Sequence, residues 1–225
     1  MAGLLARPFR SEIQYQGQYA DFAFDLFTAS APVYRNMLTF LGRYGATLRD
    51  LRQDAPTVAD ANISCTLFDL TTTVRFYLDR LEVTFAKFHE VGGEHATHIC
   101  LDAWGALQAS DSTIRLARHT VVLGFHADLV KGTIEELIGQ HVAPSKIFGD
   151  KTRSAILYYL RDQGEVGAGS NVYLDRSLLK DGALYVKLTL VLDAAQVPLE
   201  KVRDRVNDVL ASIAKHMGLE VERTH

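Results

Sequence analysis

Two imidazoles and a carboxylate recur at helical spacing in the segment EHATHICLDAWGALQAS. His95, His98 and Asp102 are separated by three and four residues, so they share one side of the helix that this segment predicts. Imidazole and carboxylate together suit zinc or another divalent transition metal, and an open coordination position would permit hydrolytic chemistry. The sequence therefore offers these three residues as metal ligands, with zinc as the candidate cofactor.

A solvated helix face explains the same three residues without a metal. An HxxH pair lacks the second supporting ligand pair that makes a metal motif specific. Glu94 would lie beside the positive end of the helix dipole, where a carboxylate is stabilised. His89 and Glu90, just before the Gly92–Gly93 break, are the nearest further ligand types. Both interpretations stay open on the sequence alone.

Other familiar motifs give no catalytic residue. Gly164, Gly167 and Gly169 form GxxGxG, the reverse of the dinucleotide fingerprint, and a strand rather than a helix follows them. This pattern indicates a hairpin loop. Cys65 falls in an apolar strand and Cys100 on an apolar helix stripe, where cysteine packs as a small core residue. We assign no catalytic residue and no organic cofactor.

Composition places the chain among ordinary folded proteins. Of its 225 residues 48% are hydrophobic and 23% are charged, and the formal net charge is −3. No run of Lys and Arg marks a surface for a phosphate backbone, so nucleic acid is not expected as a partner. No apolar stretch is long enough to span a bilayer, and the opening MAGLLARPFRSE lacks the core of a secretion signal. We expect no membrane contact and a cytoplasmic location.

Periodicity indicates strands and helices along the chain. β-branched and aromatic residues at alternate positions predict strands, which are expected at 63–88 (two or three), 112–126, 155–161, 171–176 and 183–193. Helical spacing and end signals predict helices, which are expected after Ser30, over 94–110, after a Thr133–Glu136 capping box, and from Pro198 to Gly218. The loop HVAPSKIFGDKTR is the strongest candidate for an internal boundary.

The last helix carries the clearest amphipathic pattern. Its apolar residues follow at spacings of three and four and make one narrow seam, which comprises Leu199, Val202, Val206, Val209 and Ile213. We expect this seam to lie on the sheet. The aromatic segment YQGQYADFAFDLF is open to three interpretations: a strand that covers a sheet edge, a docking segment for a partner, or ordinary core.

The tetrapeptide YLDR occurs at 77–80 and again at 173–176, each time next to predicted strands. The similar order of elements indicates a duplicated β-β-α-β unit, although one four-residue match is also compatible with coincidence. We predict an α+β fold: a largely antiparallel sheet of long strands with about four helices on one face. A single domain would span 1–225, with an N-terminal segment 1–58 and related halves at about 60–130 and 150–225.

Two functions fit this sequence. The first is a non-enzymatic cytoplasmic binding or assembly protein that self-associates or binds a protein partner, because long strands have edges to protect. The second is a protein that binds a small molecule, or a metal-dependent enzyme, with a pocket between sheet and helices. His95, His98 and Asp102 would serve the enzyme. The sequence does not decide whether the protein is an enzyme.

Overall fold

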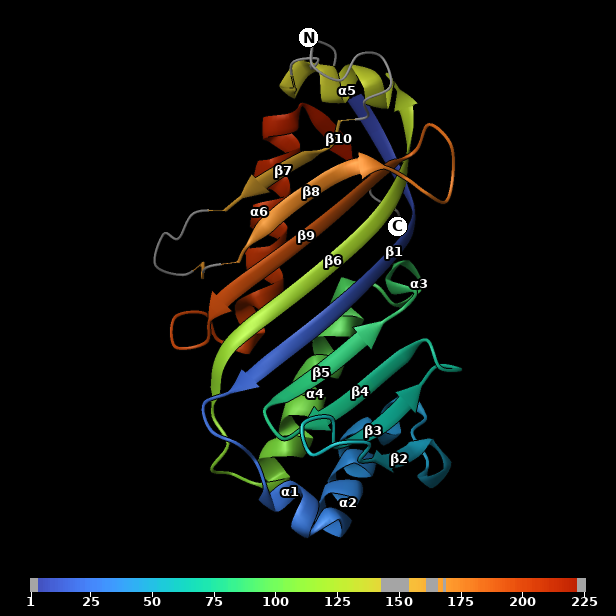
Figure 1. The fold of residues 1–225 in the computed structure, drawn as a ribbon. Helices are drawn as coiled ribbons and strands as arrows, with labels where there is room; N and C mark the ends of the chain where they lie inside the picture. The colour runs from blue at the N-terminus through green and yellow to red at the C-terminus, as the bar shows by residue number, and fades with distance from the viewer. Residues whose placement is uncertain (1–3, 143–153, 161–165, 168, 222–225) are drawn as a thin grey trace.

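A single large sheet organises the chain. The computed structural model describes residues 4–142, 154–160, 166–167 and 169–221. Its ten strands run in the order β2-β3-β4-β5-β1-β6-β9-β8-β7, with β10 paired to β1 (Figure 1). Every pairing between strands is antiparallel except that of β1 with β10. The predicted α+β class with a largely antiparallel sheet is confirmed.

The strands differ greatly in length, and the two longest lie side by side at the centre. Their bounds are β1 Leu4–Tyr19, β2 Leu51–Asp54, β3 Asn62–Leu67, β4 Thr72–Tyr77, β5 Arg80–Phe85, β6 Leu116–Lys131, β7 Ile156–Tyr159, β8 Asn171–Arg176, β9 Leu184–Asp193 and β10 Leu219–Val221. The N-terminal segment is therefore not an edge strand, because β1 pairs with β5 on one side and β6 on the other. Alternating residues predict a strand but not its position in a sheet.

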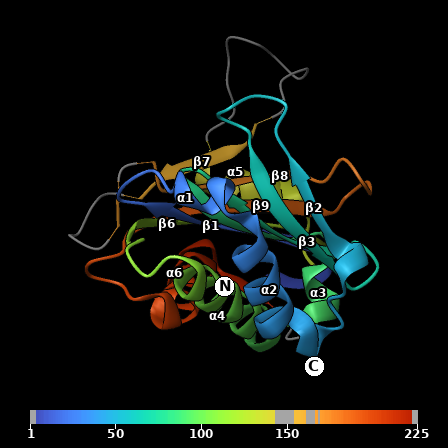
Figure 2. The ribbon, with the colours of Figure 1, turned by 90° about the horizontal axis from the view of Figure 1, so that it is seen from below.

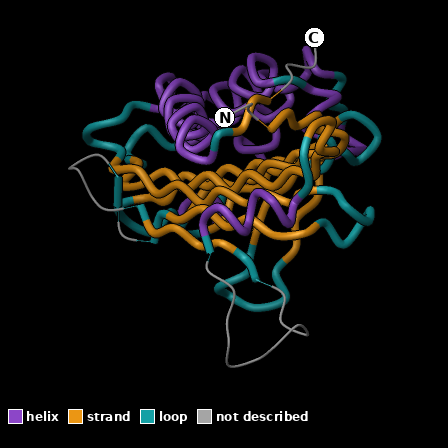
Figure 3. The backbone as a smooth tube through the Cα atoms, turned by 90° about the horizontal axis from the view of Figure 1, so that it is seen from above, coloured by secondary structure: helices purple, strands orange, loops and turns teal. Residues whose placement is uncertain are grey.

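The longer helices pack on one face of this sheet. The helices are α1 Asp25–Thr28, α2 Ser30–Leu41, α3 Phe88–Val91, α4 Gly93–Ser110, α5 Ile134–His141 and α6 Val202–Met217, with short 3₁₀ turns at Gly42–Tyr44, Leu48–Asp50 and Leu199–Lys201. Viewed along the sheet, α2, α4 and α6 form a layer on one side (Figures 2 and 3). The opposite face, toward the viewer in Figure 1, has no such helix layer. No helix in the described part of the chain is long and apolar enough to cross a membrane.

The C-terminal helix lies on the sheet as its seam predicts. Leu199, Val202 and Val206 are buried, and Val209 and Ile213 are partly buried against the core. The helix ends at Gly218, whose φ of 64° is left-handed, and its N–H donates to the last-turn carbonyls. The chain then adds β10 beside β1. The apolar residues that alternate along the strands and those of the α6 seam therefore belong to the same core.

Of the two helix N-termini predicted from capping residues, one has the predicted cap and the other does not. Thr133 and Glu136 form the predicted capping box at the start of α5. Helix α2 begins at Ser30, but no side-chain hydrogen bond caps it. Of the predicted boundary loop, residues 143–153 lie outside the described residues. The division into one domain therefore stays a prediction.

The two YLDR segments occupy related but unequal places. The first bridges the β4–β5 hairpin and the second ends β8. The Asp79 carboxylate accepts a hydrogen bond from its neighbour's guanidinium at 2.8 Å, whereas Asp175 accepts from its neighbour's backbone N–H at 2.7 Å. The final strands also differ, because β6 is a long antiparallel partner of β1 and β10 is a short parallel one. Internal duplication is not confirmed.

Candidate functional site: a cleft between the helices and the sheet

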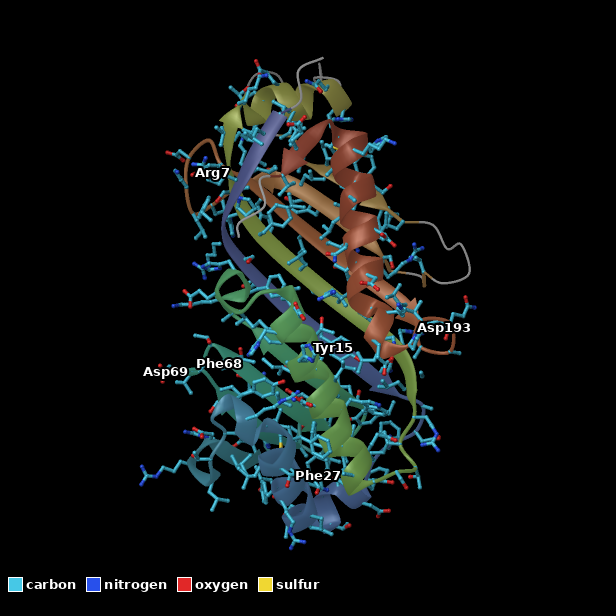
Figure 4. All side chains as sticks on the ribbon, turned by 180° about the vertical axis from the view of Figure 1, so that it is seen from behind. Arg7, Tyr15, Phe27, Phe68, Asp69 and Asp193 are labelled. Carbon is cyan, nitrogen blue, oxygen red and sulfur yellow. The ribbon has the colours of Figure 1, made fainter. Side chains whose placement is uncertain are left out.

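A cleft opens on the helix-covered face where the first halves of α4 and α6 pass each other. Figure 4 shows Tyr15 of β1 behind the gap between these two helices. The cavity has a volume of about 250 Å³. Side chains from β1, β5, β6 and four helical segments line it, and they are Ile13, Tyr15, Phe85, Phe88, Gly93, Ala96, Thr97, Cys100, Val121, Leu123, Leu199, Val202, Arg203, Val206, Asn207 and Leu210. The centre of the molecule therefore holds a partly open apolar space.

Short side chains on α4 leave this space unfilled. Gly93, Ala96 and Cys100 face α6 at spacings of three and four, so one stripe of α4 carries little volume. The hydroxyl of Thr97 donates to the Gly93 carbonyl at 2.8 Å and so is used within the helix. At the rim, the Arg203 stem lies 3.8 Å from where a Cβ on Gly93 would be. The cavity thus has an apolar interior and a polar rim.

A buried hydrogen-bond chain lies behind the cleft. The hydroxyl of Tyr15 donates to Nδ1 of His119 at 2.9 Å, and Nε2–H of His119 donates to the Val197 carbonyl at 2.9 Å. Only this tautomer gives each atom a matching partner, because a carbonyl can only accept. Tyr15 is 3% exposed and His119 is 1% exposed. The chain ties β1 and β6 to the loop that leads into α6.

Burial decides the protonation states around the cleft. It raises the pKa of the Cys100 thiol to about 12 and the pKa of the Tyr15 phenol well above its ordinary value. Burial also lowers the pKa of His119, which the hydrogen bond to Val197 and the charge of Glu200 only partly offset. At neutral pH the thiol, phenol and imidazole are all uncharged. The lining therefore suits an apolar ligand, and Cys100 is not a ready thiolate nucleophile.

The lowered pKa of His119 predicts a pH dependence of stability. The unfolded chain takes up a proton near pH 6.5, whereas folded His119 resists it, so unfolding is favoured as pH falls below about 6.5. We expect the free energy of unfolding to fall between pH 7 and pH 5.5, and to fall less steeply in His119→Gln. Urea titrations at several pH values measure both slopes. Equal slopes in the two proteins would assign the effect to other groups.

The predicted metal ligands lie apart from this cleft, on the far side of α4. The Asp102 carboxylate binds the Arg43 guanidinium and accepts a hydrogen bond from the Tyr44 hydroxyl at 2.6 Å. The His95 ring meets the ring of Tyr44 edge-on, with centroids 5.3 Å apart. Nε2 of His98 lies 4.0 Å from a carboxylate oxygen of Glu94. Each member of the predicted trio therefore has a partner other than a metal.

No metal-holding group of three or more His, Cys, Asp or Glu side chains occurs among the residues that the structure describes. A metal ion at this site would need the Asp102 carboxylate as a ligand, but that carboxylate is already paired with the Arg43 guanidinium. Neither His89 nor Glu90 joins the trio: His89 Nδ1 faces the backbone N–H of Ser11 at 3.4 Å. The metal site at His95, His98 and Asp102 gains no support from these contacts and stays a prediction.

A strained turn lies beside His95. Phe68, Asp69 and Leu70 in the β3–β4 turn have φ values of 52°, 51° and 71°, in the left-handed region that non-glycine residues seldom adopt. The ring of Phe68 lies 6.0 Å from that of His95, and Figure 4 shows Phe68 and Asp69 at the edge of the molecule. No residue type in this segment pointed to the strain, because the segment contains no glycine.

The two cysteines lie in the core, and the described part of the glycine loop lies beside β9. Cys65 and Cys100 are both buried free thiols in the core, as expected. Of the glycine loop, Gly164 lies outside the described residues, while Gly167 donates its N–H to the carbonyl of Val191 beside β9. The sequence suggested a pocket between sheet and helices as one alternative but not its lining, and Tyr15 was treated only as one aromatic residue of uncertain role.

Comparison with known proteins gives little more than a weak likeness of fold. No family model matches the chain, and no curated protein matches it in sequence. Among solved structures, the chain is similar to the rolling circle replication initiator protein from Geobacillus stearothermophilus. The TM-score is 0.37 and the identity 10%, over 93% of this chain and 84% of the other.

Two predictions from the sequence are corrected by this match. A replication initiator is at odds with a non-enzymatic assembly protein, and equally with the exclusion of nucleic acid as a partner. The exclusion rested on the absence of a basic run, and a run describes neighbours in the chain rather than neighbours on the folded surface. A likeness this weak carries no function over to this chain.

Proposed function

We propose that this protein binds a small apolar molecule in the cleft between the sheet and helices α4 and α6. The observation that carries the proposal is an apolar cavity of about 250 Å³ at the centre of the fold. Protein interiors pack closely, and a partly open apolar space of this size with a few polar groups at its rim is typical of a binding cleft. Its volume is below the usual range for drug-sized ligands, which favours a compact molecule.

The polar groups around the cavity support the same ligand class. The Tyr15 hydroxyl is bonded to His119 and the Thr97 hydroxyl to Gly93, so neither needs a ligand. Arg203 and Asn207 are exposed and line the rim, where a polar end of the ligand would meet them. The ligand therefore has an apolar body, with any polar group at one end.

A location in the cytoplasm is part of this proposal. Cys65 and Cys100 are free thiols, and reduced cysteines are typical of that compartment.

Filling the cavity provides the test. Leucine at position 96 would extend from α4 into the space, so we expect Ala96→Leu to abolish binding of the apolar dye N-phenyl-1-naphthylamine while the protein stays folded. Dye fluorescence measures binding, and thermal unfolding monitors the fold.

The matched control is Ala109→Leu, which makes the same change at an exposed position of the same helix. We expect this variant to bind the dye like the unchanged protein. Dye binding that survives Ala96→Leu, or an unchanged protein that does not bind the dye at all, would contradict the proposal.

A further inference from the structure

The uncovered face of the sheet carries a second hollow, opposite the cleft. Adjacent strands β4, β5, β1, β6 and β9 line it, mostly with polar side chains, whereas the helix-covered side of the same strands is apolar. Its volume is about 380 Å³. This face is the one toward the viewer in Figure 1. Because side chains alternate along each strand, residues of the hollow and residues of the core come from the same segments.

A glycine creates the hollow. Gly124 of β6 pairs with Glu12 of β1 on one side and with Lys187 of β9 on the other. A Cβ at Gly124 would lie 3.3 Å from both the Glu12 carboxylate and the Tyr185 hydroxyl. These two groups therefore lie next to the space that a side chain at position 124 would occupy. Gly124 does not have a positive φ. Its backbone therefore does not require glycine, and the space above it is what glycine provides.

The side chains around this gap have unused hydrogen-bonding capacity. Among the described residues, Glu12, Lys187 and Tyr185 form no side-chain hydrogen bond or ion pair, and the same holds for Gln14 and Thr84. Glu82, at the wall, is by contrast already bonded to Arg75 at 3.0 Å and to Gln16 at 3.2 Å. The free groups include donors and acceptors, so they can bind a ligand that offers both.

Glu12 and Lys187, which carry opposite charges, lie on either side of the gap at Gly124. Glu12 and Lys187 are separated by the one strand that carries Gly124, which puts their backbones about 10 Å apart, or two strand spacings. An anion in the gap would be repelled by Glu12 and a cation by Lys187. A molecule with an ammonium group at one end and a carboxylate at the other complements both charges at once.

We propose that this hollow binds a small linear zwitterion, with its ammonium group on Glu12 and its carboxylate on Lys187. Tyr185, Gln14 and Thr84 would then bond polar groups along its length. Glu12 and Lys187 start from backbones about 10 Å apart and form no ion pair with each other, so a ligand that bridges them must carry its two charges several bonds apart. A compact amino acid such as glycine carries its two charges on either side of a single carbon atom and does not span the gap.

Titration with 6-aminohexanoate tests the proposal, with hexanoate, hexylamine, glycine and glucose as comparison ligands. We expect 6-aminohexanoate to bind most tightly by ligand-observed NMR or calorimetry. Gly124→Val should abolish this binding, because valine fills the gap and suits a strand. Thr120→Val, on the same face of the same strand but away from the hollow, is the control and should bind normally.

Reversal of the charges provides the sharpest readout. Glu12→Lys or Lys187→Glu alone leaves two like charges and should weaken binding by about fivefold or more. The double variant restores one charge of each sign, so the ligand can bind in the opposite direction and affinity should recover. Equal binding of hexanoate, hexylamine or glucose, binding that survives Gly124→Val, or failure of the double variant to recover would overturn the proposal.

Discussion

His119→Phe is expected to lower the free energy of unfolding by about 2–4 kcal/mol, since it leaves two buried polar groups without partners. In the folded protein His119 accepts from the Tyr15 hydroxyl and donates to the Val197 carbonyl, and it is 1% exposed. Phenylalanine occupies a similar volume but offers neither interaction. The cost is therefore that of unpaired polar groups rather than of a cavity. Urea denaturation measures it.

Tyr15→Phe separates the two hydrogen bonds. It leaves only Nδ1 of His119 without a partner, so we expect a smaller loss of about 1–3 kcal/mol. When Tyr15→Phe is combined with His119→Phe, the Tyr15 hydroxyl and the imidazole are both gone, and only the Val197 carbonyl stays unpaired. The double variant should therefore lose less stability than the sum of the two single variants.

Tyr159→Phe is the control for loss of a hydroxyl. Tyr159 is 73% exposed, so the free energy of unfolding should stay within about 0.5 kcal/mol of the original value. Strictly additive losses in Tyr15→Phe and His119→Phe would show that the two side chains do not act as one hydrogen-bonded unit.

Val206→Asp is expected to destabilise the protein by about 3–5 kcal/mol, because it places a carboxylate without a partner in the interface between α6 and the sheet. Val206 is 7% exposed and belongs to the apolar seam of the helix. The same position lines the cleft, so binding of an apolar dye should weaken as well. Circular dichroism during urea titration measures the loss of stability.

Ala211→Asp provides the matched control on the same helix. Ala211 is exposed, so its new carboxylate stays hydrated and the free energy of unfolding should change by less than about 0.5 kcal/mol. If both variants lost the same stability, the cause would be reduced helix propensity or charge in general. Burial of the Leu199–Ile213 seam would then not explain the result.

The elements of this fold are largely predictable because their signals are local. A Thr133–Glu136 capping box begins α5, and left-handed Gly218 ends α6, as the residues alone indicate. The seam of α6 follows in the same way from spacings of three and four. Each of these signals depends on residues within a few positions of one another, so no tertiary information is needed to detect them.

The position of each strand in the sheet was not predictable by the same means. The aromatic N-terminal segment was expected at an edge as one alternative, yet β1 lies at the centre between β5 and β6. Pairings such as Glu12 with Gly124 join residues more than a hundred positions apart. An alternating pattern shows which side chains share a face but not which strand lies beside it.

The sequence by itself determined the α+β class, the start of α5, the end of α6 and the apolar seam of α6, because these depend on periodicity and capping within short segments. Only the tertiary structure decided the candidate sites. It paired Asp102 with Arg43 and Tyr44, joined Tyr15 to His119 and opened the cleft beside them. Binding sites are made from side chains of distant segments, and their distances are fixed by strand order and helix packing rather than by neighbours in the chain.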